Sequence, residues 1–140
     1  MSGLPTACLF FNGLIVMMAG LLVGFPLRSA IANKKEAAVN AWRVAHSVFV
    51  MDGLVILMIG ITLPHLVLGR LAMWILVWSL IASGYGFVVA FTIGAWKGLR
   101  GLTAKPYGLN TLLFGAHVIG ASGSLIGVAV AIYGSLKAML

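Results

Sequence analysis

The sequence predicts an all-α integral membrane protein, a bundle of four transmembrane helices forming one domain over residues 1–140. Hydrophobic residues make up 62% of the chain and charged residues only 8%, which is far from the composition of soluble domains. Four apolar runs each reach the roughly 20 residues that cross a bilayer as a helix. The basic residues are concentrated in the connections between these runs, so the formal charge of +7 indicates membrane topology and no nucleic-acid partner.

The four helices are expected at about residues 4–27, 44–68, 71–95 and 109–136. Pro26 and Pro64 stand near the ends of runs, where proline disturbs a helix least. Pro106 fits a turn before the fourth helix. No basic segment precedes the first run, so we expect a retained helix there and not a cleaved signal. The short second connection makes helices 2 and 3 antiparallel neighbours.

The distribution of Lys and Arg predicts the orientation. Seven of the nine lie in the first and third connections: Arg28, Lys34, Lys35, Arg43, Lys97, Arg100 and Lys105. Arg70 and Lys137 are on the other side. The positive-inside rule therefore places the first and third connections in the cytoplasm and both termini outside.

Small residues at helical spacing indicate seams where helices approach closely within lipid. They stand at Gly20 and Gly24 in the first run, and at Ala116, Gly120, Gly123 and Gly127 in the fourth. Such seams can serve a monomer or an oligomer, and the sequence leaves both open.

Polar side chains within the spans are candidates for function, because an acid at mid-bilayer costs about 2.5–3.5 kcal/mol on insertion scales. His46 lies just below the predicted cytoplasmic surface, and Asp52 lies about 9 Å deeper at about 1.5 Å per residue. Phe91 and Thr92 fall near the cytoplasmic end of helix 3. These depths predict a polar pocket in the cytoplasmic leaflet. With Thr92, the further residues that depth places in this pocket are Tyr85, Asn110 and His117.

Each polar residue also has a purely structural interpretation. His46 can be an interfacial histidine bonded to a loop carbonyl. Asp52 can be protonated, or bonded to His117 or Tyr85. His117 is more simply a satisfied residue at a helix contact than a ligand, and Tyr85 is most simply a packed side chain with a bonded hydroxyl.

Several chemistries are excluded by composition. Glu36 and Asp52 are the only acids, so no paired carboxylates exist within the spans. Cys8 is the only cysteine, which excludes a disulfide or multi-cysteine metal site within one chain. The three histidines lie on separate segments, with His65 on the outer side, so they do not form a compact zinc motif. A haem site needs less: one axial ligand, an apolar slot and cations for the propionates. His46 can supply the ligand, and the cations can come from Arg43, Lys97 or Arg100.

The segment AWRVAHSVFVMDGLVILMIGITLP, residues 41–64, resembles the second helix of the bacterial styrene oxide isomerases. The shared pattern is Ala45-His46-Ser47 and the closing Leu63-Pro64, with Asp52-Gly53 where that family has Asn-Gly. The run Arg100-Gly101-Leu102-Thr103 matches at the same separation from the histidine. The resemblance extends over about the whole chain.

The resemblance implies a homotrimer in the bacterial inner membrane that binds haem b between protomers, with His46 as the axial ligand. In that family, ferric iron acts as a Lewis acid on the oxygen of a small lipophilic epoxide, which rearranges to an aldehyde without net redox. Asp52 stands where the family has an active-site Asn, and Phe91 where it has an active-site Tyr.

These two departures bear on the reaction. Asp donates a hydrogen bond only when protonated, whereas Asn always can, and Phe91 has no hydroxyl. Six residues also place His46 and Asp52 about 120° apart around a helix, so they do not share one stripe. A different haem enzyme with Asp52 as acid or base, and a non-catalytic haem-binding protein, remain alternatives.

Overall fold

The computed structural model describes residues 3–140, and it is all-helical over that range. The elements are α1 (Gly3–Leu22), α2 (Gly24–Ala32), α3 (Glu36–Thr62), the short 3₁₀ helix η1 (Leu63–His65), α4 (Arg70–Lys97) and α5 (Leu109–Met139). Taken as continuous spans, Gly3–Ala32, Glu36–His65, Arg70–Lys97 and Leu109–Met139 are each long and apolar enough to cross a membrane. The predicted four-helix membrane fold is confirmed.

The helix bounds differ from the predicted ones at the second span. It begins at Glu36 instead of residue 44, because the helix continues beyond the stretch that is apolar enough for lipid. It ends in η1, where Pro64 cannot continue the α-helical ladder, and Leu66 is already extended. The first span continues to Ala32 but is interrupted at Val23. Pro26, which has no amide hydrogen for the Leu22 carbonyl, accounts for this break.

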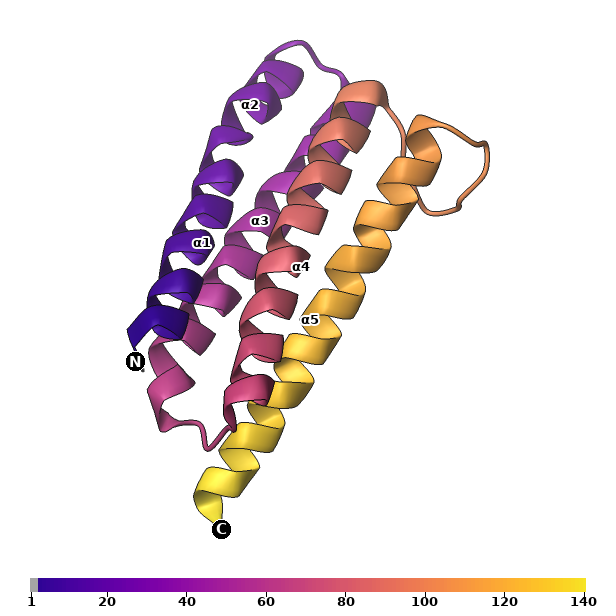
Figure 1. Cartoon of the computed structure of the whole chain (residues 1–140). Coiled ribbons are helices and arrows are strands. Elements are labelled where there is room, and N and C mark those ends of the chain that lie inside the picture. Colours follow the sequence, from indigo (N-terminus) through magenta and orange to yellow (C-terminus); the bar gives the residue numbers. More distant parts are fainter. Residues whose placement is uncertain (1–2) are drawn as a thin grey trace.

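The helices pack mainly as consecutive pairs. The most extensive contacts join α1 to α3 and α4 to α5, and further contacts join α3 and α1 to α4. Figure 1 shows α5 crossing along α4 on the side away from α1, with both chain ends at one end of the bundle. The predicted antiparallel neighbours, helices 2 and 3, are α3 and α4.

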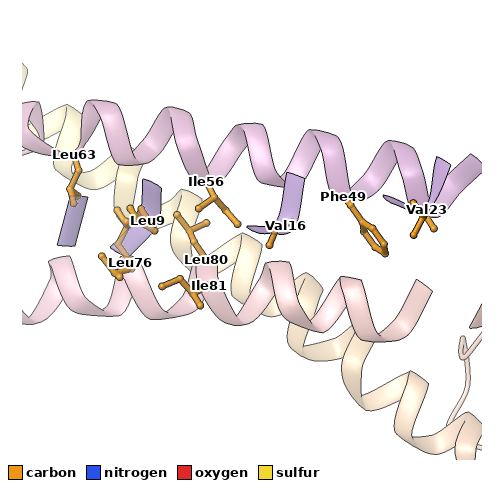
Figure 2. Packing of buried hydrophobic residues seen from close by; sticks show 11 residues of the cluster. Leu9, Val16, Val23, Phe49, Ile56, Leu63, Leu76, Leu80 and Ile81 are labelled. Atoms are coloured by element: carbon orange, nitrogen blue, oxygen red, sulfur yellow. The ribbon is translucent and has the colours of Figure 1, made fainter. Parts of the chain in front are cut away.

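The core lies where α1, α3 and α4 meet. Figure 2 shows its labelled side chains between the ribbons of α3 and α4. Its fully buried members include Leu9, Val16, Phe49, Ile56, Leu76 and Leu80. Lipid is as apolar as these side chains, so they stabilise the bundle by close packing more than by leaving water.

Glycines allow close helix packing at two seams within the chain, one between α1 and α3 and the other between α4 and α5. A Cβ on Gly53 of α3 would lie 2.7 Å from the backbone nitrogen of Met17 in α1. A Cβ on Gly123 of α5 would lie 2.5 Å from the Ser79 carbonyl oxygen of α4. The α4–α5 seam also buries Ser83, whose hydroxyl donates to the Gly120 carbonyl at 2.8 Å. The small residues predicted at 20, 120, 123 and 127 therefore serve packing within the monomer, whereas Gly24 faces open space.

Candidate functional site

His46 is held by a hydrogen bond to a neighbouring helix. Its Nδ1 atom lies 2.7 Å from the carbonyl oxygen of Gly20 in α1. A carbonyl oxygen only accepts, so Nδ1 carries the hydrogen and donates it. In the neutral ring, Nε2 then keeps its lone pair. Metal-binding histidines are oriented in this way, with the second ring nitrogen donating to a carbonyl or carboxylate.

This bond depends on the absence of a side chain at Gly20. A Cβ there would lie 2.8 Å from Val50 Cγ2 and 2.9 Å from the Val50 backbone nitrogen. Only glycine lets α1 come close enough to α3 for its carbonyl to reach the imidazole. The structural interpretation of His46 expected a loop carbonyl as its partner. The partner is instead a carbonyl within helix α1.

Asp52 lies on a different face of α3, directed toward α1 and α4. Its Oδ2 atom is buried and has no hydrogen-bond partner within the described residues. A Cβ on Gly84 of α4 would lie 3.3 Å from this oxygen and 2.7 Å from Val16 Cγ2. The carboxyl group thus reaches the space that Gly84 leaves free, among apolar side chains.

One structural alternative for Asp52, a bond to His117 or Tyr85, is not formed by Oδ2. The Tyr85 hydroxyl donates instead to Asn12 Oδ1 at 2.8 Å, which ties α4 to α1. The His117 Nε2–H donates to the Arg100 carbonyl at 3.2 Å. Tyr85 and His117 are therefore satisfied at helix and loop contacts, as their structural interpretations predict.

Phe91 belongs to an aromatic cluster where α3, α4 and α5 meet. Its ring lies 4.7 Å from the His117 ring in a T-shaped arrangement at 84°. It also lies 6.4 Å from Phe49 and 5.9 Å from Phe87. Phe49 follows His46 by three residues and lies about 60° from it around α3, so the cluster packs beside the face of the helix that carries the imidazole.

The loop between α4 and α5 is anchored by residues that the depth estimate had placed in a pocket. Asn110 Nδ2 donates to the carbonyls of Thr103 at 2.6 Å and Lys105 at 3.0 Å. Gly101 has a φ of +59°, a backbone conformation that favours glycine. It also packs closely against Leu113 of α5. With His117 bonded to the same loop, a single polar pocket shared by His46, Asp52 and His117 is not formed within one chain.

The basic residues predicted to pair with haem propionates lie at the end of the bundle that carries the α2–α3 and α4–α5 connections. Arg43, Lys97 and Arg100 are all exposed. Arg43 precedes His46 by three residues and so lies about 60° away on the α3 surface. Residues 3–140 contain no group of three or more His, Cys, Asp or Glu side chains that could hold a metal ion.

The sequence does not predict two contacts that position the site, between His46 and Gly20 and between Tyr85 and Asn12. The bonded pairs are 26 and 73 residues apart, and they depend on helix rotation. The only signal for the first was the small-residue pattern at Gly20, which indicates a close approach without naming the partner.

Fold and site together define a class of protein. It is a helical membrane protein with four spans, in which the His46 imidazole is bonded through Nδ1 at the α1–α3 contact and keeps the Nε2 lone pair. A family model described as styrene oxide isomerase matches residues 6–136. The chain belongs to this isomerase family, as the resemblance of its second span had indicated. No curated protein and no solved structure matches the chain.

Proposed function

We propose that this protein is a membrane-bound haem-b isomerase that rearranges a small lipophilic epoxide to a carbonyl compound. The observation that carries the proposal is the hydrogen bond from His46 Nδ1 to the Gly20 carbonyl, which leaves Nε2 available as an axial ligand. The described residues offer no cluster of side chains for a bare metal ion. A porphyrin supplies its own nitrogen ligands and needs only one from the protein.

His46 would hold the haem iron, and Arg43, Lys97 and Arg100 would pair with the propionates. Ferric haem supplies a Lewis acid for the epoxide oxygen. His46 is half-buried and Arg43 exposed in one chain, which leaves room for a second chain at this seam. We therefore propose a homotrimer with haem between protomers. We place it in the bacterial inner membrane, with residues 33–35 and the loop between α4 and α5 in the cytoplasm.

Asp52 and Phe91 would line a substrate pocket. Because Asp52 lies on a different face of α3 from His46, in the trimer it would serve a neighbouring pocket and not the haem held by His46 of its own chain. In its protonated form, Asp52 can donate a hydrogen bond to the substrate oxygen, the task that Asn performs without a change of charge. Phe91 presents an apolar ring held edge-on by His117. In this arrangement the ring can exclude water from a lipophilic substrate but cannot donate to it.

A second candidate is a haem enzyme that uses Asp52 as acid or base. The observation in its favour is that Oδ2 is committed to no partner among the described residues. Product analysis decides between the two, because a rearrangement gives a carbonyl isomer of the epoxide, and a redox or dehydration step changes the mass.

The haem assignment is tested by absorption spectroscopy of the protein purified in detergent. We expect a Soret band in the wild type and its loss in His46→Ala. The matched control is His65→Ala, which removes the histidine of η1 at the opposite end of α3 and should retain the band. A colourless wild type, or a band unchanged in His46→Ala, would contradict the assignment.

A further inference from the structure

A cleft of about 530 Å³ opens at the end of the bundle that carries the α2–α3 and α4–α5 connections, and its lining residue Trp42 lies one turn before His46 on α3. It is formed by the end of α1, by α2, by the connection from α2 to α3, by the first two turns of α3 and by the last two turns of α4. Its lining residues are Leu22, Val23, Pro26, Ser29, Ala30, Asn33, Lys35, Ala38, Trp42, Thr92, Ala95 and Trp96. Volumes of about 300–1,000 Å³ are typical of pockets that hold small ligands.

The cleft results from the break in the first span. The chain is interrupted at Val23, and α2 packs on α3 as a separate short helix. The small side chains of Ala30, Ala38 and Ala95 then leave the space between α2 and α4 unfilled. The imidazole of His46 is not among the lining residues, although Trp42 lies one turn before it on α3.

The lining is amphiphilic and its charge has one sign. Most of the wall is apolar, with the indole rings of Trp42 and Trp96 among the alanines. Of the described residues that line the cleft, Lys35 alone is charged and none is acidic. Glu36 faces a separate hollow that it shares with Lys34 and Arg43, so it does not oppose Lys35 across this cleft.

We propose that this cleft binds an anionic phospholipid, with its phosphate at Lys35 and an acyl chain along the wall that includes Trp42 and Trp96. The cleft lies at the ends of membrane spans, which is the depth of lipid headgroups. Tryptophan is enriched at this depth, and basic pockets between transmembrane helices bind anionic headgroups. A neutral lipophilic epoxide has no charge to match Lys35. The proposal does not depend on the proposed isomerase activity.

The chain offers a matched pair of lysines for the test. Lys35 lines the cleft, and its neighbour Lys34 lines the separate hollow. Delipidated full-length protein would be titrated with phosphatidylglycerol in detergent, and bound lipid would be counted by native mass spectrometry. We expect Lys35→Gln to weaken binding about fivefold, the effect of one basic residue near an anionic lipid. Lys34→Gln should bind as the wild type does.

Three further arms test the headgroup, the acyl chain and the cleft itself. Phosphatidylcholine should bind to the wild type more weakly than phosphatidylglycerol does. The two lipids should bind to Lys35→Gln with equal affinity. Glycerol phosphate, which carries the phosphate without acyl chains, should not compete at the same concentration. Ala95→Phe should fill the cleft and weaken both lipids. The proposal is overturned by equal affinity for the two lipids, by equal losses in the two lysine variants, or by full competition from glycerol phosphate.

Discussion

At the scale of single residues, His46 and Asp52 of α3 have opposite surroundings. His46 has a fixed partner, whereas Asp52 Oδ2 has none within residues 3–140. The chain pattern was sufficient to single out both residues and to place them on different faces of the helix. It was not sufficient to pair Gly20 with His46 or Gly84 with Asp52, because the neighbour of a helical residue depends on the rotation and approach of another helix.

Gly20→Ala is expected to destabilise the protein and to disturb the His46 site together. Its new Cβ would meet Val50 at 2.8 Å, and overpacking of this kind costs about 1–3 kcal/mol. Thermal unfolding in detergent measures the first effect, and the Soret position and intensity measure the second. Gly24→Ala is the control, because a Cβ there meets nothing within 4 Å and should change stability by less than about 0.5 kcal/mol. Equal effects of the two variants would contradict the role given to Gly20.

Asp52→Asn with Phe91→Tyr restores the residues that the resemblance assigns to the substrate pocket. We expect the double variant to convert styrene oxide to its aldehyde faster than the wild type, because a neutral donor and a hydroxyl then face the substrate. Gas chromatography of the products measures the rate, with the Soret band as a check on haem content. An unchanged rate at full haem content would show that the pocket differs more widely.

At the scale of helices, the sequence predicted the spans well and their ends poorly. Hydropathy detects the part of a helix that suits lipid, so it could not find the turns of α3 between Glu36 and residue 43. It also could not show the break at Val23, because proline near a predicted end carries the same signal as proline within a longer helix. The small-residue seams were predicted, but their internal use depended on the pairing of α4 with α5.

The α4–α5 seam gives a prediction at this scale. Gly123→Ala would place a Cβ 2.5 Å from the Ser79 carbonyl oxygen, and the backbone has to move to relieve it. We expect a loss of about 1–3 kcal/mol, seen as a lower unfolding temperature in detergent. Gly115→Ala lies on the same helix with nothing within 4 Å, so it should leave that temperature nearly unchanged. If Gly115→Ala were as damaging as Gly123→Ala, the cause would be α5 itself and not the seam.

At the scale of the whole molecule, α5 is attached along one side only. Many of its large apolar side chains are exposed, among them Leu125 at 73% and Ile132 at 63%. In the homotrimer proposed from the family resemblance, neighbouring chains would cover part of this face in place of lipid.

Native mass spectrometry of the haem-loaded protein tests that proposal. We expect a complex of three 14.7 kDa chains with three haem groups, which separates into chains without haem when His46 is replaced by Ala. A monomer that keeps its haem would argue against a site between protomers.

The pairing of consecutive helices also implies an order of assembly. Membrane helices insert before they pack, and the α1–α3 and α4–α5 pairs each contain their own close glycine seam. The hydrogen bond from Tyr85 to Asn12 joins one pair to the other. Gly84, which faces Asp52 Oδ2, likewise belongs to the second pair. The surroundings of Asp52 are therefore completed only when the pairs dock, so this carboxyl group reports on the last step of folding, whereas His46 finds Gly20 within the first pair.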